Sequence, residues 1–172
     1  MGATETFRVF TSQPKWDQLA HKMDQLGDFK PEIVADTAEI TAIDPRNESA
    51  IAELNGQANA ALVTVADDLG IAAIPAFRLL AARLDARHAI LLKDSLTPSQ
   101  ESETDFQDTL LGASAVIGSL LSDGIGDAIL IQGEEAPGQS MRLSYNILQA
   151  AGARIFKTDY VACPSCGRTL FN

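Results

Sequence analysis

The sequence predicts an α/β protein built from parallel β/α units, and three observations support this prediction. Short apolar runs of strand length recur along the chain, segments with apolar residues at helical spacing lie between them, and turn-forming residues separate the two kinds of segment. Such alternation is typical of parallel strands joined by helical crossovers. The composition, 46% hydrophobic and 21% charged, is that of an ordinary globular domain.

Five segments have the length and apolar character of strands, and they comprise residues 7–10, 32–36, 59–65, 88–94 and 128–132. Helical segments of about ten to fifteen residues separate most of them. About five β/α units form either an incomplete barrel or a small open sheet, and the hydrophobic period alone does not distinguish these two architectures.

The first predicted helix follows the strand 7–10, and in the segment 11–14 Ser12 or Thr11 is in position to cap it. Gly27 is expected to end it. Its apolar face is formed by Trp16, Leu19, Ala20, Met23 and Leu26, which recur at helical spacing. We therefore interpret Trp16 as a core residue rather than as a residue that stacks on a ligand.

Two shorter helices are predicted in the middle of the chain. The turn at 44–48 leads into a helix over 49–55, and an amphipathic helix over 74–84 has Pro75 in its first turn, where proline is tolerated. Both follow predicted strands or turns closely, as β/α units require.

The longest predicted helix begins near Thr104 or Asp105, either of which could cap it. A broad apolar face is expected from Phe106 to Leu121, with Gly112 and Gly118 permitting close packing. Gly124 is expected to end this helix, Asp127 to open the next strand, and a last helix to end near Gly152. These elements complete the alternating pattern.

Composition and charge exclude several classes of function. The chain has 172 residues and a formal net charge of -10, so nucleic acid and anionic membranes would repel it. No apolar run reaches the roughly 20 residues needed to span a bilayer. Residues 1–10 show no targeting segment, and the two cysteines do not form a secreted disulfide framework, which indicates a reducing compartment.

Charged residues follow two of the predicted strands directly. Asp67 and Asp68 follow 59–65, and Lys93 and Asp94 end the segment 88–94. The carboxyl ends of parallel strands are where α/β folds bind ligands, so a metal site at the aspartates and a catalytic or phosphate-binding role for Lys93 and Asp94 are hypotheses. A solvated loop and a structural ion pair are the favoured interpretations.

The two cysteines, Cys163 and Cys166, form a C-x-x-C pair near the C-terminus. Two thiols at this spacing can bind one soft metal centre, but a complete zinc or iron–sulfur site needs three or four ligands. His21 and His88 are weak candidates for a further ligand. Half of a zinc site, a thiol–disulfide pair and two reduced thiols without a metal all stay open. Only six residues follow Cys166, too few for the helix of a thioredoxin-type motif.

The segment that contains both cysteines carries a resemblance to a known family. It reads Lys-Thr-Asp-Tyr-Val-Ala-Cys-Pro-Ser-Cys-Gly-Arg-Thr-Leu-Phe over residues 157–171, and related features occur upstream at 120–127, Leu-Leu-Ser-Asp-Gly-Ile-Gly-Asp, and at 144–149. This pattern resembles the start of the iron–sulfur domain of the 4-hydroxy-3-methylbut-2-enyl diphosphate synthases. The resemblance is specific from about residue 110 onward.

The resemblance implies an activity and a cofactor. The family performs the reductive ring opening of 2-C-methyl-D-erythritol 2,4-cyclodiphosphate in non-mevalonate isoprenoid biosynthesis, with ferredoxin or flavodoxin as electron donor. Its 4Fe-4S cluster is held by three cysteines and a glutamate. Cys163 and Cys166 match the first two ligands, and the other two belong to a later segment that this sequence does not contain. The resemblance therefore implies a fragment of a bacterial cytoplasmic enzyme, inactive alone.

The resemblance also implies a domain organisation. The strand 128–132 reads Ala-Ile-Leu-Ile-Gln and lacks the arginine and serine that hold the diphosphate in shorter family members. This difference resembles the longer plant and bacterial form, which has a second, barrel-like insert domain. We expect residues 1–152 to form this partial or degenerate TIM-barrel-like insert and 153–172 to begin the iron–sulfur domain.

Two alternatives from other classes stay beside this interpretation. One is a non-catalytic, acidic β/α structural module with a zinc-binding C-x-x-C tail, and the other is a thiol–disulfide protein. Metal content would separate the first alternative from the synthase, and the rate of thiol alkylation would identify the second.

Overall fold

A computed structural model of the chain describes residues 6–35, 40–97, 105–134 and 136–158. Its centre is a sheet of six strands, all parallel, in the spatial order β2-β1-β6-β5-β4-β3. The strands are β1 (Arg8–Ser12), β2 (Ile33–Ala35), β3 (Thr41–Ile43), β4 (Leu62–Val65), β5 (Ala89–Lys93) and β6 (Ala128–Leu130). The prediction of an α/β fold with parallel β/α units is confirmed.

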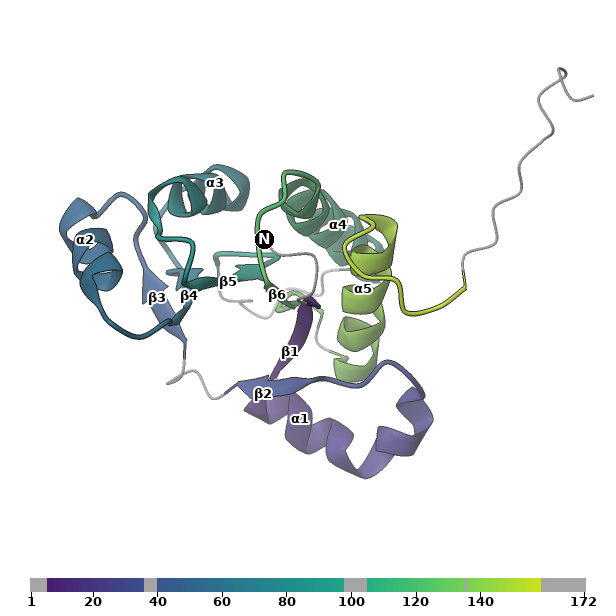
Figure 1. Ribbon diagram of the computed structural model, residues 1–172. Coiled ribbons are helices and arrows are strands. Elements are labelled where there is room, and N and C mark those ends of the chain that lie inside the picture. The colour runs from purple at the N-terminus through teal and green to yellow at the C-terminus, as the bar shows by residue number, and fades with distance from the viewer. Residues whose placement is uncertain (1–5, 36–39, 98–104, 135, 159–172) are drawn as a thin grey trace, which may run out of the picture.

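The strand order follows a ring that is open at one place. Strands that are consecutive in sequence pair with each other, except for β2 and β3, which form the two edges, and β6 pairs with β1. The sheet curls into a half-barrel (Figure 1), as the twist between adjacent parallel strands favours. This arrangement is the incomplete barrel of the two architectures that the hydrophobic period left open.

The helices cover one face of the sheet. They are α1 (Gln13–Leu19), the 3₁₀ helix η1 (Ala20–Leu26), α2 (Glu48–Gly56), α3 (Ala73–Arg83), α4 (Phe106–Ser122) and α5 (Pro137–Ala150). Each strand except β2 is followed by a helix, and Figure 1 shows α3, α4 and α5 in turn along the outside of the sheet. Short β/α units of this kind bury the apolar stripe of each helix against the strands.

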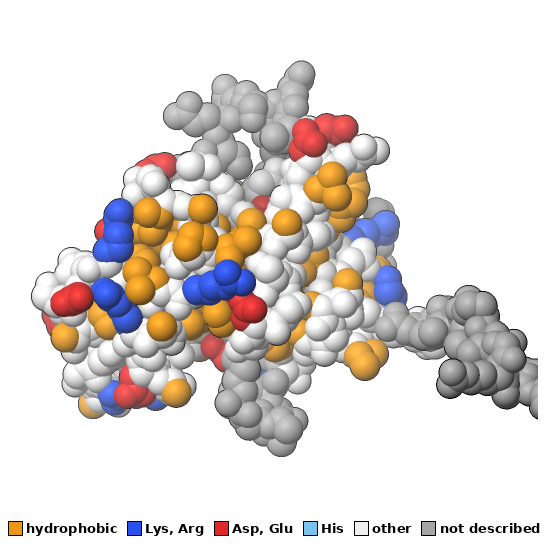
Figure 2. All heavy atoms as spheres, turned by 90° about the horizontal axis from the view of Figure 1, so that it is seen from above, with side chains coloured by type: hydrophobic (Ala, Val, Ile, Leu, Met, Phe, Trp, Pro, Cys, Tyr) orange, Lys and Arg blue, Asp and Glu red, His pale blue; other side chains and the backbone are white. Residues whose placement is uncertain are grey.

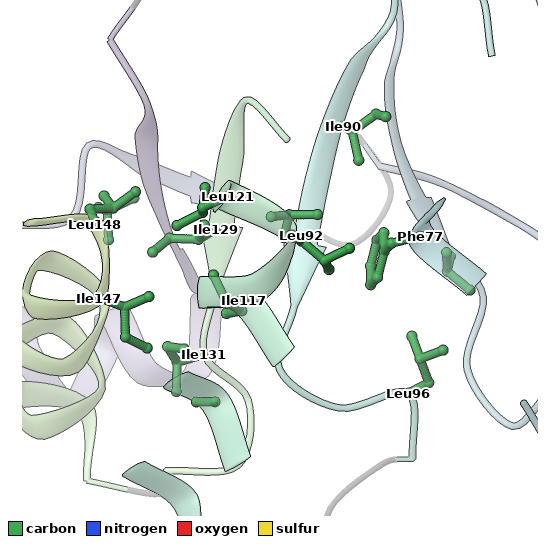
Figure 3. Close-up of a cluster of buried hydrophobic side chains, with 14 of the residues drawn as sticks. Phe77, Ile90, Leu92, Leu96, Ile117, Leu121, Ile129, Ile131, Ile147 and Leu148 are labelled. Atoms are coloured by element: carbon green, nitrogen blue, oxygen red, sulfur yellow. The ribbon is translucent and has the colours of Figure 1, made fainter. Parts of the chain in front are cut away.

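The main core lies between the sheet and these helices. Alternate residues of the strands, such as Leu92 and Ile129, point toward buried helix residues such as Phe77 and Ile117 (Figure 3). The opposite, inner face of the sheet holds a small cluster of Phe10, Leu91, Ala128 and Leu130. Strands that are buried on both faces explain why the sequence shows continuous apolar runs rather than strict alternation.

Two expectations about the strands and the first helix are corrected. β3 was not among the five predicted strands, because it is three residues long and its residues Thr41 and Ala42 lack a continuous apolar run. The first predicted helix is α-helical only to Leu19 and continues as the 3₁₀ helix η1, which Gly27 ends with φ of 57° as expected.

The expected broad apolar face of α4 is also corrected. Ala113, Ile117, Leu120 and Leu121 are buried, but Leu111 keeps 68% of its surface exposed, and Phe106 and Leu110 are exposed as well. Only the second half of α4 therefore packs fully on the sheet. A Cβ atom added at Gly112 or Gly118 would meet no atom within 4 Å, so the expectation of close packing there is wrong.

Seen from above, the helix-covered side of the molecule mixes apolar, basic and acidic side chains (Figure 2). On this side, a salt bridge of 2.8 Å between Arg78 of α3 and Asp123 at the end of α4 connects these two helices. Among the helices of the described ranges, none has the length and apolar character needed to cross a membrane.

Candidate functional site

The two predicted ligands, Cys163 and Cys166, lie outside the described residues. The structure instead shows the segment that leads toward them. α5 ends at Ala150, and Gly152 with φ of 67° reverses the chain. The amides of Ala153 and Arg154 both donate to the carbonyl oxygen of Leu148, at 3.0 and 3.2 Å. Residues 153–157 therefore turn back along the domain; we call them the arm.

The side chain of Gln149 holds the far end of the arm. Its Oε1 accepts hydrogen bonds from the amides of Phe156 and Lys157, both at 3.2 Å, and its Nε2 donates to the carbonyl oxygen of Lys157 at 2.9 Å. Gln149 is 8% exposed. A buried amide whose donor and acceptor are both used contributes stability and also fixes the geometry of its partners.

Arg154 ties the arm to the start of the sheet. Its Nη1 donates to the carbonyl oxygen of Phe7 at 2.8 Å and to Glu32 Oε2 at 2.7 Å, and Glu32 in turn accepts from the amide of Val9. The hydrogen bond that Arg154 donates to the Glu32 carboxylate holds the pKa of Arg154 above its ordinary value. The guanidinium also lies 5.3 Å from the ring centre of Tyr145.

An aromatic cluster completes these contacts. The ring of Phe156 lies 5.3 Å from that of Phe29 and 5.0 Å from that of Tyr145, with tilted or edge-on geometry. The hydroxyl of Tyr145 donates to the carbonyl oxygen of Lys30 at 2.7 Å. Burial raises the pKa of Tyr145, which keeps the phenol neutral and able to donate.

The carboxyl edge of the sheet brings together two of the charged residues that the sequence singled out. Lys93 Nζ lies 2.6 Å from Asp67 Oδ1, and the lysine side chain is 5% exposed while that of Asp67 is 40% exposed. Because β4 and β5 are adjacent, their ends meet, so the two hypotheses about Asp67 and Lys93 concern one ion pair. Its contacts are those of a structural pair.

Asp94 and Asp68 serve the backbone near this ion pair. Asp94 accepts from the amides of Gln132 and Gly133, at 2.8 and 3.0 Å, and so connects the end of β5 to that of β6. The amide of Asp68, which has φ of 57°, donates to the carbonyl oxygen of Leu96. The Asp94 carboxylate and the backbone amide of Asp68 therefore support the loops that follow β5 and β4.

Lys15 was not singled out by the sequence, although it reaches the same edge. From α1 its Nζ donates to the carbonyl oxygens of Ile131, Gln132 and Glu134, at 3.0, 3.3 and 2.7 Å. These partners lie more than one hundred positions away in the chain, and the pairing of β6 with β1 brings them next to α1. No local pattern indicates this contact.

The two histidines lie apart from each other. His88 is buried, and its Nδ1 accepts from the amide of Ala61 at 3.1 Å. His21 is exposed and lines a cavity of about 570 Å³ between η1 and the start of α5, together with Lys22 and Arg142, which are also exposed. Within the described ranges, no group of three or more His, Cys, Asp or Glu residues could hold a metal ion.

Comparison with known proteins identifies relatives along the whole chain. The chain is 44% identical over 172 residues to the 4-hydroxy-3-methylbut-2-en-1-yl diphosphate synthase (flavodoxin) of Akkermansia muciniphila, which covers 100% of this chain and 29% of that protein. It is 41% identical over 99 residues to the ferredoxin-type synthase of Picosynechococcus sp., covering 58% of this chain and 24% of that protein. No family model matches the chain.

A third relative, the flavodoxin-type synthase of Protochlamydia amoebophila, is 52% identical over 66 residues, which are 38% of this chain and 10% of that protein. The chain thus spans less than a third of the length of these curated relatives. The resemblance found in the motif at 157–171 is confirmed, because the chain matches the 4-hydroxy-3-methylbut-2-en-1-yl diphosphate synthase family from end to end at 44% identity and fits a fragment of such a protein.

Proposed function

We propose that this chain is part of a 4-hydroxy-3-methylbut-2-en-1-yl diphosphate synthase and serves the reductive ring opening of 2-C-methyl-D-erythritol 2,4-cyclodiphosphate in isoprenoid biosynthesis. The observation that carries the proposal is the 44% identity over all 172 residues to a protein of that name. The names of the relatives specify flavodoxin or ferredoxin, so we assign one of these as electron donor to the enzyme. The activity would belong to the bacterial cytoplasm.

Within that enzyme we assign a structural role to residues 1–152, as the barrel-like insert domain. The charges at the carboxyl edge of the half-barrel support this assignment. Lys93 is paired with Asp67, Asp94 accepts two backbone amides, and Lys15 donates to three carbonyl oxygens. These groups satisfy one another and the backbone, whereas a catalytic barrel directs such groups toward its substrate.

We assign Cys163 and Cys166 as two ligands of a 4Fe-4S cluster at the start of the iron–sulfur domain, residues 153–172. Thiolates are the donors that such clusters use, so the pair fits the cluster in kind. It does not fit in number, because the sequence has no third cysteine. The remaining ligands, a cysteine and a glutamate by the family resemblance, would come from the rest of the longer protein. When bound, the cluster supplies electrons to the substrate.

Anaerobic reconstitution with iron and sulfide tests the assignment. The 172-residue chain is compared with a version extended through the next cysteine and glutamate of the longer protein, and each is measured by absorbance near 400 nm and by metal analysis. We expect only the extended chain to hold about four irons per monomer. The matched control replaces Cys163 and Cys166 with serine in the extended chain, which should abolish iron binding.

A different outcome would favour the structural module with a zinc-binding tail. If neither version takes up iron but the chain binds zinc stoichiometrically through Cys163 and Cys166, the cluster assignment is wrong. If instead the two thiols are alkylated unusually fast near neutral pH and bind neither metal, the thiol–disulfide alternative replaces both.

A further inference from the structure

The first half of α4 carries three large apolar side chains that stay exposed. Phe106, Leu110 and Leu111 are 42%, 36% and 68% exposed, and among the described residues Ile155 is the only other large apolar side chain that is exposed. Phe106 and Leu110 are four positions apart and therefore neighbours on the helix, and Leu111 adjoins Leu110. We call these three residues the α4 patch. Single exposed apolar side chains are common, but a group of large ones marks an interaction surface.

The composition of α4 also differs from that of a helix with one side in water. Asp108 is the only charged residue among its 17 residues. Ala113 packs in the main core, whereas Leu111 and Ala115, each two positions away, lie on the opposite side of the helix and are exposed. A helix that is apolar on all sides is normally covered on all sides. The outer side of α4 therefore calls for a partner.

Acidic residues border the α4 patch. Asp105 caps α4 and Asp108 lies in its first turn, and neither forms an ion pair with a residue that the structure describes. A complementary surface would have an apolar centre and basic side chains at its margin. A second copy of this chain does not meet this requirement, because it would bring the same acidic margin and a formal net charge of -10.

The length of the relatives indicates where a suitable surface lies. The chain corresponds to 29% of the Akkermansia muciniphila synthase, so most of such a polypeptide lies outside these 172 residues. We propose that the α4 patch is the surface by which this domain docks on the remainder of the longer polypeptide, against an apolar area bordered by basic groups. The proposal rests on the assignment of the chain to a longer synthase, and it adds to that assignment the docking surface.

Leu111 is the central residue of this contact. It is the most exposed of the three side chains of the α4 patch. The neighbouring Gly112 and Ala115 carry little or no side chain, and a Cβ atom added at Gly112 would meet no atom within 4 Å. A partner side chain can therefore lie against the backbone of α4 beside Leu111.

Thiol labelling beside Leu111 tests the docking. Ala115→Cys is introduced into the 172-residue chain and into the longer protein, and modification of residue 115 is followed by mass spectrometry of its peptide. We expect this thiol to react about tenfold or more slowly in the longer protein, because a covered thiol reacts only when the contact opens. Glu53→Cys, at an exposed position of α2, is the matched control and should react equally fast in both proteins.

Substitutions in the α4 patch and its margin separate docking from other causes of slow labelling. In the longer protein, Leu111→Asp should return labelling at residue 115 to the rate of the 172-residue chain, whereas Leu111→Met keeps an apolar side chain and should retain most of the protection. Asp108→Lys should raise the labelling rate about threefold to tenfold by repulsion from the basic margin, and Asp108→Asn should raise it less. None of these changes should alter labelling in the 172-residue chain.

Three results would overturn the proposal. One is equal labelling of residue 115 in the two proteins. Another is labelling that is slow, relative to the Glu53→Cys control, in the 172-residue chain at about 1 μM, which would mean that the chain covers its own patch. The third is labelling of this chain that becomes slow only at about 100 μM, which would mean that a second copy covers the patch. These rates require neither iron nor activity, so a failure of docking is distinguished from a failure of the cluster assignment, which reconstitution tests.

Discussion

Replacing Gly126 with alanine should lower the free energy of unfolding for two separate reasons. The backbone conformation at residue 126 is unfavourable for alanine, and the added Cβ atom would clash with a buried side chain. Gly126 lies between α4 and β6 with φ of 107°, a conformation that residues with a side chain rarely adopt. A Cβ atom there would lie 2.6 Å from Leu92 Cδ1 and 2.8 Å from Leu92 Cγ. Leu92 is fully buried in the main core and has little room to move (Figure 3).

The two costs can be estimated and separated. An unfavourable backbone conformation costs about 1–3 kcal/mol, and overpacking a core costs about 1–3 kcal/mol more, so Gly126→Ala should lower the free energy of unfolding by about 2–6 kcal/mol. Gly124 is the matched control, since its φ is 75° and an added Cβ would meet no atom within 4 Å. Gly124→Ala should therefore cost only the conformational part, about 1–2 kcal/mol.

Equilibrium unfolding in urea measures both variants against the unchanged chain. A double variant with Leu92→Ala adds a direct test of the contact. Leu92→Ala alone should cost about 2–5 kcal/mol, but it also removes the atoms that Cβ at residue 126 would meet. The double variant should then be more stable than the sum of the single effects by about 1–3 kcal/mol. Equal costs for Gly124→Ala and Gly126→Ala, or strict additivity with Leu92→Ala, would refute the reasoning.

Three further predictions concern charged and phenolic groups. Burial raises the pKa of Tyr145 above its unfolded value near 10, so the contribution of this phenol to stability should be complete below about pH 10 and decline as the pH rises through the folded pKa. Tyr145→Phe should flatten this decline, as measured by urea unfolding at about pH 9–11. Lys93→Met should cost at most about 1 kcal/mol, whereas Asp67→Ala strands a buried ammonium and should cost about 3–5 kcal/mol; equal costs would contradict this asymmetry. Asp94→Ala should speed amide exchange at the two residues that it accepts from and cost about 1–3 kcal/mol, whereas an unchanged exchange rate would show that the carboxylate is dispensable there.

The sequence predicted those parts of the fold that are encoded locally. The apolar runs at 59–65 and 88–94 contain β4 and β5, and Asp105 occupies the N-cap of α4, where its side chain accepts from the amide of Gln107. In each case neighbouring residues carry the signal, through hydrophobic period or capping. The strand β3 carried too little local signal, because three residues with Thr41 and Ala42 among them do not form an apolar run.

Contacts between distant segments could not be predicted in the same way. Nothing near Lys15 indicates that its ammonium reaches the end of β6, and nothing near Gln149 distinguishes it from an ordinary exposed helix residue. The Asp67–Lys93 pair required knowing that β4 and β5 are adjacent. Leu111 shows the opposite limit, since its helical spacing predicted burial but it is 68% exposed in the structure.

The place of β6 in the strand order has a consequence for how the chain folds. β6 is three residues long and pairs with β1 on one side and β5 on the other, so it joins a two-stranded piece, β2-β1, to a three-stranded piece, β5-β4-β3. The register couples Arg8 to Ala128, across most of the chain. Such a distant pairing slows folding, and a growing polypeptide cannot close this sheet until residue 130 has left the ribosome. Until then the β1–β2 pair has no third strand beside it. A chain released from the ribosome before residue 130 would therefore contain a two-stranded pair that is only marginally stable.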